Sequence, residues 1–163
     1  MALIQGLAAE EIARILSVAE PILAYITAYE DNQHGGVLCV ANRDNGVSLA
    51  SFVFGCLRND EYEECRIFAE EKPVRLARNI LHYLSSESRD MTTTPKQYGG
   101  AIRGRNFILS FSGFKEVQDE AAMLLVELRL GGGEANMPTW LRDAIAGNSY
   151  FAKLQMGTEP ATD

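Results

Sequence analysis

The chain has 163 residues, of which 47% are hydrophobic and 23% are charged, an ordinary composition for one globular domain. Its formal net charge is −7 at pH 7, and its arginines occur as pairs such as Arg103 with Arg105, not as a basic patch. Because nucleic-acid phosphates repel an acidic surface, the composition argues against binding to nucleic acid.

The amino terminus does not resemble a secretory signal. It has no basic segment ahead of its apolar residues, and Glu10 and Glu11 interrupt them. No apolar run approaches the length that spans a membrane. Cys39, Cys56 and Cys65 form no Cys-x-x-Cys pair, and hairpin register separates the first two, so we expect no disulfide. The sequence predicts a soluble, cytoplasmic protein without a membrane partner.

Residues 7–31 show the spacing of an amphipathic helix. Apolar residues recur every three or four positions, which places them in one stripe: Ala8, Ile12, Ile15, Ala19, Ile22, Ile26 and Tyr29. Pro21 cannot donate a backbone hydrogen bond, so we expect either a kinked helix or two helices. The stripe is typical of a core helix, and its regular repeat also permits pairing between subunits.

A hairpin and a second helix follow. Val37 to Ala41 and Val47 to Phe54 are apolar runs joined by a turn that contains Asn45-Gly46, the strongest short hairpin signal. A helix is predicted from Glu61 to Leu84, interrupted at Pro73. Its expected buried side comprises Ile67, Phe68, Val74, Ala77, Ile80, Leu81 and Leu84. Ser85 to Gln97 is polar and is predicted to be an exposed loop.

The segment from Tyr98 to Leu130 predicts a second hairpin and a third helix. The alternation at Phe107, Leu109 and Phe111 is that of a strand, with a turn near Gly104-Arg105 before it. A helix over 116–130 begins with acidic residues, which suit the positive end of the helix dipole, and its predicted apolar face is Val117, Ala121, Leu124, Leu125 and Leu128. A tail helix is predicted from Pro138 to about Leu154, weakened in its middle by Gly147-Asn148.

Two hairpins separated and flanked by helices predict an α+β fold. We expect an antiparallel sheet of two hairpins covered by helices. The sequence further suggests a domain over residues 1–133, with the helix and polar tail of residues 134–163 added to the same domain.

Several short motifs occur in the order seen in one known family. They are an Ala-x-x-Lys-x-x-x-x-Ala-like segment at Ala69–Ala77, Gly99-Gly100, Ser112-Gly113, and Asp-Glu-Ala at Asp119–Ala121. With the order of elements, these residues resemble the GlcG/HbpS-like family from about Leu7 to Leu130. The resemblance implies a profilin-like α-β-α fold with an extra carboxy-terminal helix. It also implies oligomers, and makes haem or iron a candidate ligand.

Candidate site residues are few. Gly99 and Gly100 permit close backbone approach, and Arg103 and Arg105 supply guanidinium groups, so together they could hold a small anionic molecule. The alternative is a turn with two solvated arginines. His34 precedes a Gly-Gly loop and could ligate haem iron, although a single loop histidine is more commonly solvated.

The sequence supplies neither a metal site nor a catalytic set. Its two histidines, His34 and His82, have no spaced carboxylate or thiol partner. Ser110 and Ser112 lack the context of a nucleophile, and the acidic residues of the third helix are explained by its dipole. An enzyme is therefore the weakest of the functional classes.

Two functional hypotheses remain open. The first is a non-enzymatic, oligomeric protein that binds a small acidic molecule, with haem as one candidate. The second is an interaction or sensory scaffold of profilin-like, PAS-like or GAF-like form without a cofactor. In either case the large apolar residues of the terminal segments predict a homo-oligomer, most simply a dimer, through the amino-terminal stripe or the helix containing Trp140.

Overall fold

The computed structural model describes residues 7–160. Its helices are α1 (Ala9–Tyr29), α2 (Asn59–Arg78), α3 (Glu116–Leu130), α4 (Thr139–Gly147) and α5 (Phe151–Thr158), with short 3-10 turns η1 (Ser85–Ser88) and η2 (Glu134–Asn136). Its strands are β1 (Gly35–Asn42), β2 (Ser48–Gly55), β3 (Ala101–Arg103) and β4 (Phe107–Ser112). The predicted α+β class is confirmed.

The described strands form one antiparallel sheet in the order β2-β1-β4-β3. Leu38 in β1 lies opposite Phe52 in β2 on one side and Phe111 in β4 on the other. Both predicted hairpins are present, because β1 pairs with β2 and β3 pairs with β4. The long pairing between β1 and β4 joins the two hairpins, so β1 and β4 form the centre of the sheet.

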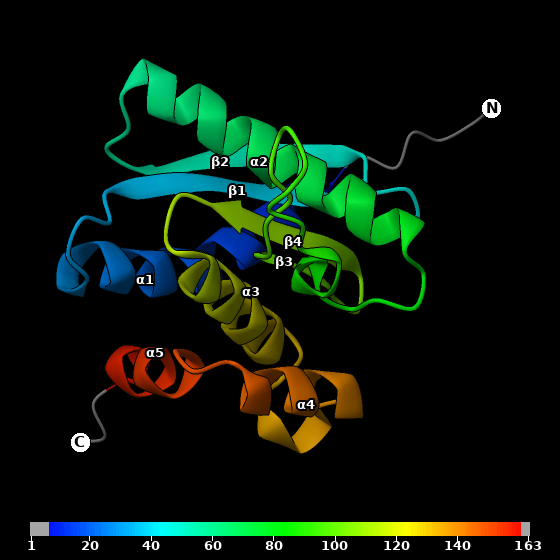
Figure 1. The fold of residues 1–163 in the computed structure, drawn as a ribbon. Coiled ribbons are helices and arrows are strands. Elements are labelled where there is room, and N and C mark those ends of the chain that lie inside the picture. The colour runs from blue at the N-terminus through cyan, green and yellow to red at the C-terminus, as the bar shows by residue number, and fades with distance from the viewer. Residues whose placement is uncertain (1–6, 161–163) are drawn as a thin grey trace.

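Helices cover both faces of this sheet. Figure 1 shows α2 along one face and α1 with α3 across the other, while α4 and α5 lie on the side of α3 away from the sheet. Alternate side chains of β1 point to opposite faces of the sheet and so contribute to both cores. Val37 and Cys39 pack toward α2, whereas Leu38 and Val40 pack toward α1 and α3. The result is the expected α-β-α layering, with the larger core between β1, α1 and α3.

The first helix runs through Pro21 without a break. By length and composition α1 is long and apolar enough to cross a membrane, a test that core helices of globular proteins also pass. In this fold its apolar stripe is covered by the sheet, by α3 and by α5. The stripe proposed for subunit pairing is therefore used inside the chain, at Ile15, Ala19, Ile22, Leu23 and Ile26.

The second helix ends earlier than predicted, and its buried side is different. It stops at Arg78, and Ile80 and Leu81 lie in the following turn with 79% and 86% of their surface exposed. Ile67 is also exposed. Tertiary pairing explains the early end, because Leu84 forms a bridge with Ile102 of β3 and cannot do so from a continuous helix.

Two further boundaries need correction. The predicted tail helix is two helices, since the Asn148 side chain accepts hydrogen bonds from the backbone N–H groups of Tyr150 and Phe151 and so starts α5 anew. Residues 85–97 are also more ordered than a plain exposed loop. Ser85 is buried and its hydroxyl accepts the Ala101 N–H, which ties η1 to β3.

Two glycine substitutions should separate a required turn from an unconstrained one. Gly46 has φ +74°, and a Cβ there would lie 2.3 Å from the Pro73 carbonyl oxygen of α2. We expect Gly46→Ala to lower the free energy of unfolding by at least about 1–2 kcal/mol. Gly147→Ala, where a Cβ meets nothing within 4 Å, should leave stability unchanged or raise it. Urea unfolding of both variants tests this; equal losses would contradict it.

Candidate functional site

The sequence-derived site residues do not come together. Gly99 and Gly100 precede β3, whereas Arg103 and Arg105 lie at its other end, around the turn into β4. His34 precedes β1, near the end of the sheet that holds Gly99 and Gly100, because its neighbour Gly35 lies against Gly113. The expected pocket of two glycines and two arginines is therefore not formed.

Arg103 is a structural residue. The prediction that it lies in an exposed turn is wrong, because only 7% of its surface is exposed. Its guanidinium donates to the carbonyl oxygens of Leu76 at 2.6 Å, Asn79 at 3.3 Å and His82 at 3.1 Å. These carbonyls belong to the last turn of α2 and the segment after it, where the regular hydrogen-bond pattern of the helix ends. Arg103 thus caps the end of α2, and few of its N–H donors remain for a ligand.

Arg105 is exposed, as expected, and lines a small hollow of about 210 Å³ between α1, the β3–β4 turn and α3. Its guanidinium donates to the Asn136 carbonyl at 3.2 Å, and its backbone N–H donates to Glu127 at 2.7 Å. Arg14 lies in the same hollow and donates to the Leu130 carbonyl. Because Glu11 and Glu127 line it as well, the hollow has no excess of positive charge for an anion.

A different cavity lies at the Gly99–Gly100 end of the sheet. It measures about 400 Å³ and is open on one side, between α2, the segment entering β3, and the turn that leads from β4 into α3. Its lining combines charged and aromatic side chains with one thiol: Glu64, Cys65, Phe68, Lys72, Tyr98, Ser112, Gly113, Phe114, Lys115, Glu116 and Asp119. We treat this cavity as the candidate site and call it the α2–α3 cavity.

A buried ion pair lies at the floor of the α2–α3 cavity. Lys72 Nζ, with 1% of the side chain exposed, lies 3.6 Å from Asp119 Oδ2 and donates a 2.7 Å hydrogen bond to the Phe111 carbonyl oxygen of β4. Asp119 Oδ1 accepts the Phe114 N–H at 2.9 Å. The pair thus joins α2, β4 and α3. Gly100 has no room for a Cβ, which would lie 2.8 Å from Lys72 Nζ.

Burial and pairing act on these two groups in opposite directions. Removal from water disfavours both charges, which raises the pKa of Asp119 and lowers the pKa of Lys72. The Lys72 ammonium and the N–H groups of Gly113 and Phe114 favour the ionised carboxylate and so lower the pKa of Asp119. Burial has the larger effect, so the pKa of Asp119 lies above its ordinary value, at about 7.

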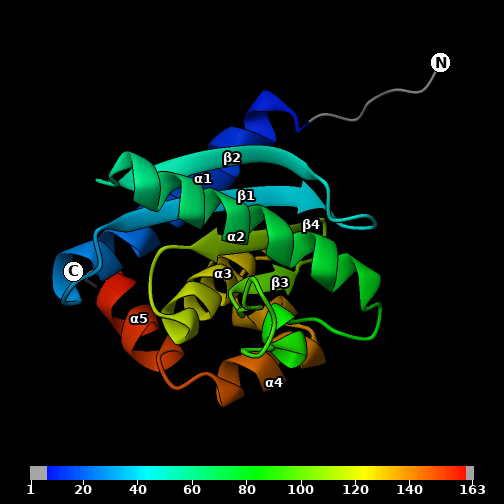
Figure 2. The same cartoon turned by 45° about the horizontal axis from the view of Figure 1, so that its top comes forward.

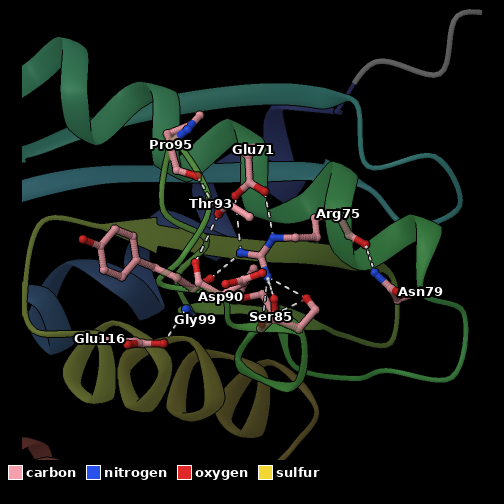
Figure 3. A network of polar contacts seen from close by, with 12 residues as sticks. Glu71, Arg75, Asn79, Ser85, Asp90, Thr93, Pro95, Gly99 and Glu116 are labelled. Carbon is pink, nitrogen blue, oxygen red and sulfur yellow. Dashed lines mark hydrogen bonds and ion pairs between the residues drawn. The ribbon is translucent and has the colours of Figure 1, made fainter.

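Arg75 holds the wall of the cavity that carries Tyr98. Figure 3 shows its guanidinium between α2 and the loop after η1. It pairs with Glu71 at 2.7 Å, donates to the Ser85 carbonyl at 2.8 Å, and also donates to the Tyr98 carbonyl. The next N–H, from Gly99, donates to Glu116 at 2.7 Å. Arg75 of α2 and Glu116 of α3 therefore hold the Tyr98–Gly99 backbone in position.

Aromatic rings form the sides of the α2–α3 cavity. Phe68 meets Tyr98 edge to face, with ring centroids 5.1 Å apart. Phe114 packs on the buried Phe111, with centroids 4.8 Å apart. Cys65 also lines the cavity and is half-buried, and desolvation raises the pKa of its thiol to about 11, which favours the protonated sulfur. Aromatic rings therefore line the cavity together with the charged side chains of Glu64, Lys115 and Glu116, above the floor formed by Lys72 and Asp119.

The residue that the sequence offers as a haem ligand, His34, does not lie in this cavity. Haem iron takes an imidazole, a thiolate, a thioether or a tyrosine phenolate as its axial ligand, and of these residue types the cavity lining holds Cys65 and Tyr98. His34 is exposed and does not line the α2–α3 cavity, and the thiol of Cys65 is held protonated. Within residues 7–160, no group of three or more His, Cys, Asp or Glu side chains is placed to hold a metal ion. We derive no haem or iron chemistry for this chain.

Two signals in the sequence could have located the pair. Lys72 follows Ala69 by three residues and precedes Leu76 by four, so helical spacing places a lysine on the buried side of α2. Asp119 belongs to the Asp-Glu-Ala motif, whose carboxylates were assigned to the helix dipole. The dipole explains an exposed acid in the first turn, but Asp119 is buried.

No protein-family model, curated protein or solved structure matches this chain.

The two arginines should differ sharply when replaced. Arg103→Ala removes charged hydrogen bonds to buried carbonyls, and we expect it to lower the free energy of unfolding by about 3 kcal/mol or more. Arg105→Ala removes one exposed hydrogen bond and should lower it by less than about 1 kcal/mol. Chemical denaturation measures both. Similar small effects would show that Arg103 does not close α2.

The buried pair should show strong coupling. At a pH above the pKa of Asp119, Lys72→Met leaves the carboxylate without its cation, which should lower the free energy of unfolding by about 3–5 kcal/mol. Asp119→Asn keeps an acceptor for the Phe114 N–H but removes the charge. In that background Lys72→Met should cost at least about 1 kcal/mol less, as a double-mutant cycle by urea unfolding would report. Additive effects would mean that the pair does not interact.

Proposed function

We propose that this protein is a non-enzymatic small-molecule-binding protein and that its ligand occupies the α2–α3 cavity. A volume of about 400 Å³ lies within the usual range of about 300–1,000 Å³ for ligand pockets. Apolar aromatic sides with a few convergent polar groups are the usual lining of such pockets.

The observation that carries the proposal is the placement of the Lys72–Asp119 pair on the cavity floor. Apolar residues can often replace a buried ion pair without loss of stability, so joining α2 to α3 does not by itself require this pair. A purely structural pair also need not lie beside a cavity that opens to solvent. Groups whose pKa values are shifted by burial gather at binding and catalytic sites.

The lining indicates the chemistry of the ligand. The Lys72 ammonium donates one hydrogen bond, to the Phe111 carbonyl, and its distance of 3.6 Å from Asp119 is too long for a second. The ammonium therefore has a further hydrogen bond to donate, which a ligand oxygen could accept. Lys72 and Lys115 face Glu64, Glu116 and Asp119, so the charges do not favour a dianion. We infer a flat, partly aromatic molecule with a neutral or zwitterionic head that both donates and accepts hydrogen bonds.

The motif residues of the GlcG/HbpS-like resemblance add support. Lys72 of the Ala-x-x-Lys segment, Gly100 of the Gly-Gly entry and Asp119 of the Asp-Glu-Ala segment meet at the cavity floor. Residues distant in sequence that converge on one cavity suit a shared binding role. We keep membership of that family as part of this proposal.

A second candidate function is an interaction scaffold without a ligand. The turn after α2 favours it, because Ile80 and Leu81 are almost fully exposed beside the stacked rings of Tyr83 and Trp140. Such apolar groups commonly mark contact surfaces. This candidate predicts that no small molecule stabilises the protein, and that substitutions at Lys72 affect stability alone.

A fragment screen by saturation-transfer NMR tests the binding proposal. A library of aromatic amides, lactams and amino acids should contain binders that the wild type and Lys153→Met retain and that Lys72→Met and Asp119→Asn lose. Lys153→Met is the matched control, since Lys153 is an exposed lysine on α5 that pairs with Glu30. Asp143→Asn, at an exposed site on α4, is the control for Asp119→Asn.

Cys65 supplies a second readout that does not depend on stability. In a Cys56→Ser background, a bound fragment should slow modification of the Cys65 thiol, because that thiol lines the cavity while Cys39 is buried in the core. Fragments that bind equally well to the Asp119→Asn variant, or that leave the rate at Cys65 unchanged, would contradict binding in the α2–α3 cavity.

A further inference from the structure

The two edges of the sheet are treated differently by the fold. Beside β3, the chain passes back along the edge: Leu84 forms a bridge with Ile102, and the Arg103 N–H donates to the Tyr83 carbonyl at 2.7 Å. No described strand lies beyond β2. Figure 2 shows β2 as the outermost strand, with α2 crossing in front of the sheet. Among residues 7–160, β2 is therefore the open edge.

The sequence of β2 lacks the features that usually protect an open edge. Natural edge strands carry charged residues or proline, or are very short. Strand β2 has eight residues, SLASFVFG, without a charge or a proline. Its irregularity lies near one end, where the register with β1 shifts between Val40 and Ala41. The rest of the edge is regular and available to another strand.

The hydrogen-bond pattern identifies the groups that face outward. The Cys56 N–H donates to His34, and the register pairs Gly36 with Phe54. Since bonding to one neighbour alternates along an antiparallel strand, Phe54 and Phe52 bond toward β1, while the N–H and C=O groups of Ser51 and Val53 point away from it. The Val53 side chain is also 53% exposed, because α2 packs mainly over β1 and β4.

We propose that the open edge of β2 pairs antiparallel with β2 of a second copy of this chain, which joins the two sheets into one. The residue pattern is self-complementary. A two-fold axis at Phe52 places Ala50 opposite Phe54 of the other copy, a small residue beside a large one, and Ser51 opposite Val53. Since β2 itself carries no charge, its own side chains bring no like charges together, and the nearby Glu70 of α2 accepts a hydrogen bond from the Ser51 hydroxyl.

The arrangement also closes. An isologous contact uses the same edge from both copies, and the covered β3 edge offers no site for a third sheet, so the pairing ends at a dimer instead of a fibre. This interface differs from the two that the sequence suggested. The central part of the α1 stripe, from Ile15 to Ile26, is buried within the chain, although Tyr29 at its end is exposed. Trp140 is partly buried and stacks on Tyr83. The inference does not depend on ligand binding in the α2–α3 cavity.

Light scattering coupled to size exclusion tests the dimer. At tens of micromolar, the wild type should give about twice the chain mass of 18.0 kDa. Val53→Lys places a charge on the pairing edge and should weaken dimerisation at least tenfold. Val47→Lys is the matched control, because Val47 is 57% exposed but lies in the turn before β2. It should dimerise as the wild type does.

Amide hydrogen exchange tests the same interface without a substitution. The amides of Ser51 and Val53 should be protected at high protein concentration and exchange faster on dilution, whereas the Phe52 amide, bonded within the chain, should be protected at both. Three outcomes would overturn the proposal. The first is a wild type that is monomeric at about 100 µM, even if it binds an extended peptide at this edge. The second is a Val53→Lys dimer as tight as that of Val47→Lys, and the third is exchange of the Ser51 and Val53 amides at a rate that does not depend on protein concentration.

Discussion

The contact between Lys72 and Asp119 is the constraint around which the rest of the architecture is arranged. A lysine on the buried side of α2 needs a counter-charge and an acceptor, and the fold provides Asp119 from α3 and the Phe111 carbonyl from β4. Gly100 leaves the space that the ammonium occupies, and Asp119 holds the turn before α3 through the Phe114 N–H. One ionic contact thus fixes helices on opposite faces of the sheet relative to each other.

Arginines perform the same task at two other junctions. Arg75 ties the segment before β3 to α2, and Arg103 binds the carbonyls at the end of α2. In both cases a guanidinium donates to several backbone carbonyls at or beyond the end of regular structure. The short β3 strand is thereby held between α2 and β4, although only three of its residues pair with β4. Charged residues inside this fold mainly anchor irregular backbone, and the α2–α3 cavity is where such an anchor faces open space.

Local pattern was enough to predict the elements that local physics controls. Asn45-Gly46 gave the first turn, and the alternation at Phe107, Leu109 and Phe111 gave β4. The wrong predictions concern residues whose structure is set by a partner distant in sequence. Leu84 is not helical because it pairs with Ile102 of β3, and Arg103 is buried because its guanidinium binds the carbonyls at the end of α2. The site was misplaced for the same reason: the arginines were visible as a pair in the turn, whereas Lys72 and Asp119 are 47 positions apart and meet only in the folded chain.

The central claim is that Lys72 and Asp119 form a buried, mutually dependent pair, and the titration of the Asp119 carboxyl carbon by NMR tests it most directly. The account predicts that the pKa of Asp119 lies well above its ordinary value, toward about 7, because burial disfavours the carboxylate. It also predicts that Lys72→Met raises this pKa further, because the ammonium stabilises the ionised form, whereas Lys153→Met leaves it unchanged. An Asp119 that titrates near pH 4 and does not respond to Lys72→Met would contradict the account.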